Sequence, residues 1–454
     1  MTAIWWLRRD LRLADNPALL AALEDGDVLP VFVRDPGLRW AGAPRRAHLE
    51  AALAALQEAS GGAVVIRSGD PRRVLPELAA EVGAPTVYVS GEFTPYARRR
   101  DRAVAEALSA GDVRLTSRGT PYAVAPGTVL TGSGTPYQVF TPFARAWREQ
   151  AEQPPLTAPG QPRWHAGVRS EQVDAALAEQ GRALGAAGET EALERWHAFL
   201  DDGLADYAEL RDRPDLDGTS RLSGHLKVGA LHPRTLLADV RTHRDADTEG
   251  ARTFVTELAW REFYGDVLWH HPDSAWADLK PALAGMEYDD GDATEELVAA
   301  WREGRTGFPF VDAGMRQLAA TGWMHNRVRM VVGSFLVKDL HVWWPLGARH
   351  FLDQLIDGDI AANNHGWQWV AGTGTDASPY FRVFNPVTQG KRFDPDGAYV
   401  RRWVPELAHL SGKAAHEPWK HRDGYAHGYP EPIVDHDAER RETLARYEAV
   451  RSQG

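Results

Sequence analysis

The sequence predicts an α/β protein: an N-terminal Rossmann-like parallel α/β domain, a long connector and an all-α domain. Over the first 120 residues, short apolar runs alternate with amphipathic helical patterns, which is typical of a parallel sheet covered on both faces. Residues 121 to about 190 are rich in proline, glycine and threonine. From about residue 189 the helical period dominates. We therefore expect boundaries at 1–125, 126–190 and 191–454.

The N-terminal domain is expected to contain five strands and four helices. The expected strands are Ile4–Leu7, Val28–Val33, Ala63–Arg67, Thr86–Ser90 and Val113–Thr116. The expected helices are Pro17–Glu24, Pro44–Ala59, Pro71–Val82 and Pro95–Ala110. Each helix begins at a proline, which favours the first helical turn. No GxGxxG motif follows the first strand, so the sequence does not indicate a dinucleotide site there.

Composition excludes several classes of protein. The 454 residues include no cysteine, which excludes a disulfide scaffold, cysteine-ligated zinc, an iron–sulfur cluster and a thiol nucleophile. No apolar run approaches the roughly 18 residues of a membrane span, and the N-terminus lacks a signal-peptide layout. We expect a cytoplasmic protein without a membrane partner. The net charge of −12 argues against a basic coat, but not against a local basic patch.

Tryptophan is unusually common, with 17 residues against 14 phenylalanines, and 12 of the 17 lie from Trp196 onward. These residues could form a tryptophan-rich helical core. They could also form stacking surfaces for bases or for a planar cofactor. Composition alone favours the core.

The segment Thr219-Ser-Arg-Leu-Ser223 follows Asp217-Gly218, and this pattern indicates a helix N-terminus. Hydroxyls and free backbone N–H groups at such a terminus suit a phosphate or pyrophosphate. Taken alone, the pattern favours a plain helix cap over a phosphate site.

Four side chains of different chemistry share one helix face. Glu257, Trp260, Arg261 and Tyr264 follow the i, i+3, i+4, i+7 spacing. A carboxylate, an indole, a guanidinium and a phenol are too polar for an ordinary core stripe. The alternative is a solvated face with a Glu–Arg pair.

A third segment, around Asn326, Arg329, Met330 and Gly333, also follows a helical period. Between Arg305 and Arg349 the local charge is +4, which suits a phosphate backbone. Scattered solvated arginines are the alternative.

The fourth segment runs from Asp357 through Asp359 and Asn363 to Trp367 and Trp369. Asp-Gly-Asp resembles a calcium loop, but the later EF-hand ligands are missing, so we expect no calcium. Carboxylates, amides and two indoles suit a heteroaromatic ring with donors and acceptors along its edge. His325 and His365 lack an HExxH-type partner, so we expect structural histidines and no metal.

In this order and spacing, the four segments resemble the flavin domain of the DNA photolyase/cryptochrome family. More narrowly, they resemble class I cyclobutane pyrimidine dimer photolyases of bacterial type. The resemblance extends over essentially the whole chain and includes Trp6–Leu13, Asp15-Asn16 and Phe140–Phe143. It implies an α/β antenna domain, a helical domain that holds FAD, and light-driven repair of the dimers in DNA. Excited, reduced FAD would donate an electron to a flipped-out dimer.

The resemblance also implies site residues. Glu257 and Asn363 are the expected catalytic residues, Asn363 through an amide facing flavin N5. The expected FAD-binding residues are Tyr207, Thr219, Ser220, Leu222, Ser223, Arg261, Asn326, Arg329, Asp357, Asp359 and Asn363. The expected DNA-binding residues are Arg211, Glu257, Trp260, Tyr264, Asn326, Arg327, Met330, Trp369, Arg382 and Lys391. Related 6-4 photolyases carry paired histidines at the position of His325-Asn326, which favours the cyclobutane lesion.

Two implied features match the family less well. The electron-transfer tryptophans correspond to Trp367 and Trp344, but the outermost position holds no tryptophan. Tyr288 is the expected substitute, and Trp269, Trp276 and Trp343 are alternatives. The segment Pro95–Asp101 resembles members whose second, antenna chromophore is a deazaflavin or FMN more than those that use folate.

Two other functions compete with repair. A cryptochrome-like blue-light photoreceptor would share the fold and FAD, although Asn363 favours a repair enzyme. A non-catalytic binder of damaged or single-stranded DNA would leave the segments at Thr219–Ser223 and Asp357–Asn363 without a purpose. We expect a monomer whose partner is DNA containing pyrimidine dimers.

Overall fold

The computed structural model describes residues 1–38, 41–185, 187–376 and 382–453, without the side chains at 282 and 453. The chain forms two compact units. The first comprises Met1–Ala205, Ser220–Pro272 and Ile356–Ala361. The second comprises Asp206–Thr219, Asp273–Leu355 and Ala362–Gly454. Each unit thus combines segments that lie far apart in the chain.

The first unit contains a parallel sheet of five strands, β1 (Thr2–Leu7), β2 (Asp27–Arg34), β3 (Val65–Ser68), β4 (Thr86–Val89) and β5 (Arg114–Ser117). Their order is β3-β2-β1-β4-β5, so the direction of winding reverses between β1 and β4. Ile4 pairs with Leu29 on one side and with Val87 on the other. Five consecutive residues of β1 are buried, as a central strand covered on both faces requires.

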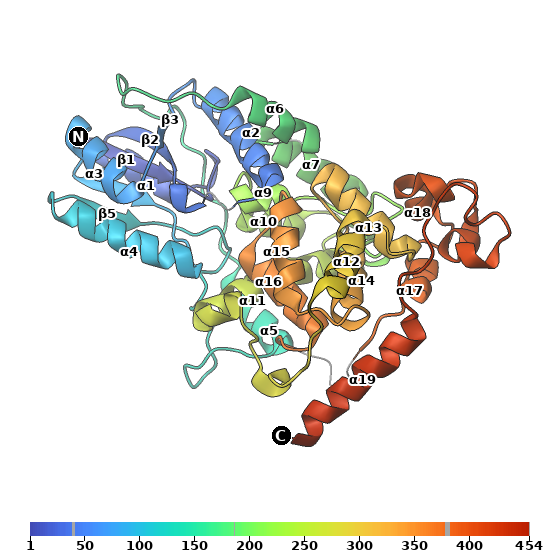
Figure 1. Ribbon diagram of the computed structural model, residues 1–454. Helices are drawn as coiled ribbons and strands as arrows, with labels where there is room; N and C mark the ends of the chain where they lie inside the picture. Colours follow the sequence, from blue (N-terminus) through green and yellow to red (C-terminus); the bar gives the residue numbers. More distant parts are fainter. Residues whose placement is uncertain (39–40, 186, 377–381, 454) are drawn as a thin grey trace. The chain divides into compact units, whose positions relative to one another are not determined.

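Four helices accompany the sheet: α1 (Pro17–Asp25), α2 (Ala43–Ala59), α3 (Pro71–Val82) and α4 (Pro95–Ser109) (Figure 1). Side chains cap three of them, because Asn16, Asp70 and Thr94 accept backbone N–H groups of the first turn. The predicted strands and helices of this domain are confirmed to within two residues at each end.

The proline-rich stretch contains more regular structure than the sequence analysis predicted. It holds α5 (Phe140–Gln150) and α6 (Ala175–Leu184), and α7 (Glu189–Asp202) begins at its end. α5 buries Phe140, Phe143 and Trp147. α6 packs closely on α2, because a Cβ on Gly181 would lie 2.1 Å from the Ala47 carbonyl oxygen. The prolines punctuate this stretch without preventing short helices from packing.

Three further helices complete the first unit: α9 (Ser223–Val228), α10 (Pro233–Thr242) and α11 (Glu249–His270). The Glu262 carboxylate of α11 accepts hydrogen bonds from earlier parts of the chain. It accepts the Trp147 indole N–H at 2.6 Å and the backbone N–H of Val124 at 3.0 Å. This helix therefore has a fixed position within its unit.

The described residues of the second unit form helices and connecting loops, with no strand among them. Its core is built around the fully buried Trp301, Phe310, Phe335, Trp344 and Tyr399. Its helices are α8 (Tyr207–Leu210), α12 (Asp292–Glu303), α13 (Pro309–Thr321), α14 (Asn326–Lys338), α15 (Trp344–Gln354), α17 (Pro386–Phe393), α18 (Ala398–Trp403) and α19 (His436–Gln453). α16 (Ile360–Ala371) belongs to it from Ala362 onward.

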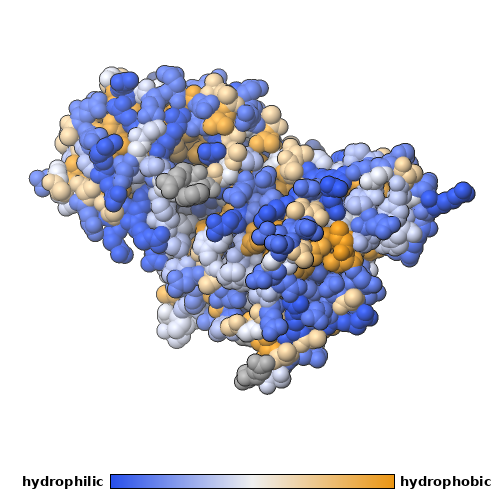
Figure 2. Space-filling model, viewed as in Figure 1, coloured by the Kyte–Doolittle hydropathy of each residue, from blue (hydrophilic) through white to orange (hydrophobic). Residues whose placement is uncertain are grey.

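Hydrophilic residues dominate the molecular face shown in Figure 2, and hydrophobic residues are scattered among them. Across the described residues, we find no helix with the length and apolar character that crossing a bilayer requires.

Candidate functional site

A helix begins at the end of the hydroxyl-rich segment, as predicted, but without a side-chain cap. α9 begins only at Ser223, and its N-cap is Leu222, whose side chain makes no capping hydrogen bond. The reason is local, because Arg221 has a φ of +50° and interrupts the turn ahead of the helix. The Ser220 carbonyl instead accepts Arg195 Nε at 2.9 Å. Ser220, Leu222 and Ser223 belong to the first unit, and Thr219 belongs to the second.

Asp359 lies in a charged cluster of the first unit. Its carboxylate contacts Arg9 Nη2 at 2.8 Å and Lys227 Nζ at 3.0 Å, and it accepts the Ala361 backbone N–H at the start of α16. Burial opposes ionisation, but Lys227 and Arg9 hold the pKa of Asp359 well below its usual range. Burial lowers the pKa of Lys227 to about 8, against the opposing effect of Asp359. Asp359 is therefore an ionised carboxylate between two cations.

Two buried histidines, which the sequence analysis missed, lie near Asp357. The rings of His48 and His225 are 6.0 Å apart, and burial lowers the pKa of His225 to about 4. Burial also lowers the pKa of His48, while Asp357 acts in the opposite direction. Lone histidines carry no sequence signal, and α2 brings His48 to this place from a distant part of the chain.

Several buried nitrogen atoms in the first unit have no hydrogen-bond partner among the described residues. Among them are Nδ1 of His225, Nη1 of Arg261 and Nε of Arg8 and Arg12, whereas His48 hydrogen bonds with the Gly224 backbone. Arg261 uses its other terminal nitrogen to donate to the Pro121 carbonyl at 3.1 Å. A buried guanidinium N–H without an acceptor is costly, so the surroundings of Arg261 fit a ligand rich in oxygen acceptors, such as a phosphate-bearing cofactor.

The predicted face of α11 is confirmed as a mixed, half-buried surface. Glu257, Trp260, Arg261 and Tyr264 are all neither fully buried nor fully exposed. Trp260 stacks on Phe140, with ring centroids 3.6 Å apart and an interplanar angle of 7°. Tyr264 lies 5.5 Å from the Trp260 ring. α5 and α11 thus build an aromatic platform beside a carboxylate, and the sequence analysis did not pair Phe140 with Trp260.

In the second unit, fewer basic side chains can bind a phosphate backbone than the sequence predicts, because carboxylates already pair with several of them. Arg327 forms a two-point ion pair with Asp212, with Nη2 and Oδ2 2.8 Å apart. Lys391 pairs with Glu417, and Arg316 contacts Glu406 at 2.7 Å. Asp212 and Glu406, which lie outside the counted stretch, therefore offset two of its four net positive charges. Arg382 is exposed, and Arg211 is half-buried with its guanidinium over the Tyr207 ring.

The remaining residues of the third segment lie on α14. Asn326 is exposed at the first position of this helix, and Arg329 and Met330 are half-buried. His325 caps the helix by accepting the Arg327 backbone N–H, in line with the expected structural role. Arg329 Nε donates to the Met324 carbonyl at 2.7 Å. No group of three metal-ligating side chains is found within the described ranges.

One face of α16 is structural. His365 hydrogen bonds with Ser274, and Gln368 donates to the Ser274 carbonyl at 2.7 Å. Asn363 lies on the same helix. Its amide nitrogen donates to the Ala348 carbonyl at 3.0 Å and to the Asn364 side-chain oxygen at 2.8 Å, both within the second unit. The role predicted for Asn363 would therefore fall to its amide oxygen or require rearrangement of these bonds. Trp369 is half-buried and stacks loosely on Phe384.

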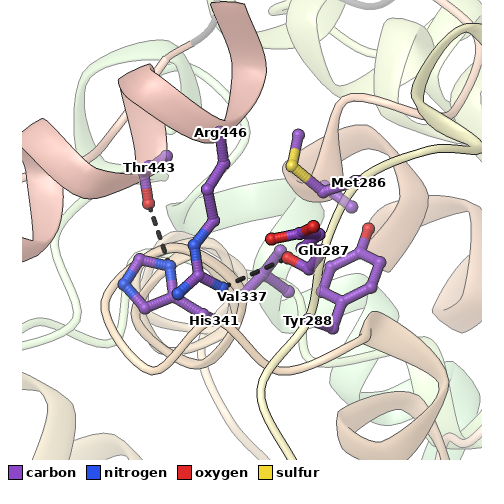
Figure 3. A pocket seen from close by; sticks show the side chains of 8 residues that line it. Met286, Glu287, Tyr288, Val337, His341, Thr443 and Arg446 are labelled. Carbon is purple, nitrogen blue, oxygen red and sulfur yellow. Dashed lines mark hydrogen bonds between the residues drawn. The ribbon is translucent and has the colours of Figure 1, made fainter. Parts of the chain in front are cut away.

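The predicted electron-transfer residues all lie in the second unit. Trp367 and Trp344 are buried, and the Trp344 indole donates to Asp278 at 2.7 Å. Tyr288 lines a pocket with Val337, His341 and residues of α19 (Figure 3). Burial and the charge of Asp278 raise the pKa of Tyr288. Tyr288 is thus near the carboxylate that binds Trp344.

Protein-family models match both the N-terminal and the C-terminal part of the chain. A model described as DNA photolyase matches residues 3–161, and one described as the FAD binding domain of DNA photolyase matches residues 254–449. A deoxyribodipyrimidine photo-lyase of Streptomyces griseus is 43% identical over 97% of both chains.

Two solved structures agree in fold. A bacterial class III photolyase from Agrobacterium tumefaciens has a TM-score of 0.92 at 38% identity, covering 99% of this chain and 98% of its own. An archaeal photolyase from Sulfolobus tokodaii, described as having two FAD molecules and a novel light-harvesting cofactor, has a TM-score of 0.84 at 29% identity, covering 99% and 100%.

Proposed function

This chain belongs to the DNA photolyase family, and we propose that it is a deoxyribodipyrimidine photo-lyase. It uses light to repair cyclobutane pyrimidine dimers in DNA. The observation that carries this function is the full-length identity of 43% to a curated enzyme of that name. A photoreceptor would share the fold, so light-dependent repair of a defined dimer is the test. A simple DNA binder does not explain the match to an FAD-binding domain.

FAD supplies the light-excited electron donor when it is bound. In the first unit, Ser220, Leu222, Ser223, Arg261, Asp357 and Asp359 are the proposed ligands, and the buried unpaired donors described above fit its phosphates. In the second unit, the proposed ligands are Tyr207, Thr219, Asn326, Arg329 and Asn363. Trp367 and Trp344 are the proposed route by which electrons reach the cofactor, with Tyr288 as the predicted outer member.

The α11 platform is the proposed contact for the extruded dimer. Trp260 and Tyr264 offer apolar ring surface, and Glu257 offers a carboxylate for a pyrimidine N–H. The proposed DNA contacts on the second unit are Arg211, Asn326, Arg327, Met330, Trp369, Arg382 and Lys391.

Glu257→Gln should slow repair while FAD stays bound. The substitution keeps the shape and removes the charge, so about 1.5 to 3 kcal/mol of charge-assisted hydrogen bonding is lost, roughly ten- to a hundredfold in rate. The measurement is repair per photon with the flavin reduced beforehand. Glu249→Gln is the matched control, because Glu249 lies on the same helix in an exposed pair with Arg252. Equal repair by both variants would remove Glu257 from the site.

DNA binding should weaken as salt rises, with a slope of about −0.9 in log K against log salt for each phosphate neutralised. Arg382→Gln should lower that slope by about one unit, because Arg382 is exposed. Arg327→Gln should lower it less, because Asp212 already neutralises Arg327. Filter-binding titrations at several salt concentrations measure both slopes, and a slope that does not respond to salt contradicts phosphate recognition.

Finer assignments have less support. The class I prediction finds none in the comparisons, since the similar structure from A. tumefaciens is named a class III photolyase. A second chromophore has a precedent in the S. tokodaii structure. Its identity here as a deazaflavin or FMN, the monomeric state, the absence of a metal, the cytoplasmic location and the domain boundaries stay predictions.

A further inference from the structure

Two neighbouring tryptophans at the start of α15 differ sharply in exposure. Trp344 is fully buried, whereas Trp343 is 44% exposed. Their ring centroids are 6.4 Å apart, with the rings 66° from parallel. An indole in contact with solvent thus lies beside an indole of the core.

The buried indole connects inward to Trp367. A Cβ on Gly347 would lie 2.3 Å from the six-membered ring of Trp367, so that ring packs against the α15 backbone. Gly347 is one helical turn from Trp344, on the same side of α15. In the second unit, the exposed Trp343 therefore contacts the buried Trp344, and the helix that Trp344 begins packs against Trp367, whose own ring contacts are with Trp301 and Phe351.

Nearby charges favour oxidation at Trp344 and Trp343. The Asp278 carboxylate at 2.7 Å from the Trp344 indole nitrogen stabilises positive charge on Trp344. At the exposed Trp343, solvent water likewise stabilises positive charge on the indole. Trp276 is also exposed, but the Arg349 guanidinium lies 5.0 Å over its ring and opposes positive charge there. Among the described residues Trp276 has no aromatic contact with Trp344.

Tyr288 is less suited to be the outer member. Oxidation of a phenol releases its proton, and no described residue accepts a hydrogen bond from the Tyr288 hydroxyl. In Figure 3 the ring lies at one side of the pocket, with Glu287 between it and the Arg446 guanidinium. Charge does not distinguish Tyr288 from Trp344, because Asp278 also lies near Tyr288 and Arg446 is paired with Asp289 and Glu442; the missing proton acceptor does.

We propose that Trp343 is the surface terminus through which electrons enter this chain toward its flavin, an inference that rests on the proposed function. One electron leaves the Trp343 indole, passes through Trp344 and Trp367, and is taken up by the light-excited oxidised cofactor. The Trp343 radical cation that results is reduced by one electron from a soluble thiolate, which becomes a thiyl radical.

The test compares Trp343→Phe with Trp276→Phe and Tyr288→Phe, each at wild-type FAD content. Flavin absorbance under blue light with a thiol present measures photoreduction. Trp343→Phe should lose most of the wild-type rate, and the other two variants should keep it. Unchanged photoreduction in Trp343→Phe, or its loss in Tyr288→Phe alone, overturns the proposal.

A second readout does not depend on cofactor turnover. Illumination in air without a thiol should leave oxidation products on the terminal aromatic residue, and peptide mass spectrometry should find them at Trp343. Oxidation at Tyr288 or Trp276 instead overturns the proposal. Trp367→Phe distinguishes failure of the whole route from failure of its outer end. If Trp367→Phe leaves photoreduction intact, the proposed route is wrong. If Trp367→Phe loses photoreduction and Trp343→Phe keeps it, only the assignment of Trp343 is wrong.

Discussion

Replacing Trp367 with phenylalanine should nearly abolish photoreduction of the oxidised flavin. Trp367 is the innermost member of the proposed route, and a phenyl ring is far harder to oxidise than an indole. The variant loses some packing, because the atoms of Trp367 against Gly333 and Gly347 belong to the six-membered ring of its indole, so its FAD content is measured beside that of the wild type. Repair by protein reduced beforehand should stay largely intact, because the dimer takes its electron directly from the flavin.

Trp301→Phe is the matched control for this experiment. Trp301 is fully buried in the same core, and its ring lies 6.3 Å from that of Trp367. Its indole donates to the Val332 carbonyl, so the variant loses one hydrogen bond but no member of the proposed route. Photoreduction should survive in Trp301→Phe. If Trp367→Phe instead stops repair by reduced protein while FAD and DNA still bind, Trp367 has a different role.

Replacing Asp359 with asparagine should destabilise the folded chain by about 3 kcal/mol, because it leaves two buried cations without their carboxylate. This value is at the low end for a broken buried ion pair, because the side chains of Asp359 and Lys227 stay 16% and 18% exposed. The pKa of Lys227, about 8 in the native chain, should fall further without its partner. FAD content should fall as well, since Asp359 is a proposed ligand.

The effect of Asp359 depends on pH in a definite direction. Its folded pKa lies below the value of an unfolded aspartate, so its contribution is present above about pH 4 and is lost as pH falls below that. The difference in urea midpoint between wild type and Asp359→Asn should therefore shrink in acid. Asp353→Asn, an exposed change, should leave the midpoint unaltered at every pH. Equal midpoints for wild type and Asp359→Asn at pH 7 contradict the ion-pair account.

The sequence predicts local structure best where the physical signal is local. The short apolar runs around Ile4, Leu29 and Val87 predict central strands, because a strand buried on both faces needs consecutive apolar residues. The spacing of Glu257, Trp260 and Tyr264 likewise defines one helix face. At Thr219–Ser223 the predicted helix start is present at Ser223, but no side-chain cap forms, and the positive φ of Arg221 just before it could not be read from the sequence.

Pairing between distant residues could not be read along the chain. Arg327 counts as a free cation in sequence, yet Asp212 lies against it in the fold. His48 and His225 are 177 positions apart and carry no motif, yet they share one buried cluster. The exposure of Trp343 beside the buried Trp344 also follows from the packing of α15, since both residues are the same amino acid.

Light-dependent repair tests the central claim most directly. The purified chain, with its FAD reduced, is mixed with an oligonucleotide that carries a single thymine cyclobutane dimer, and the products are separated after illumination or darkness. The account predicts conversion of the dimer to two thymines in the light, none in the dark, and no change in an oligonucleotide that carries a 6-4 photoproduct. An intact dimer after illumination, with reduced FAD and bound DNA both verified, would contradict it.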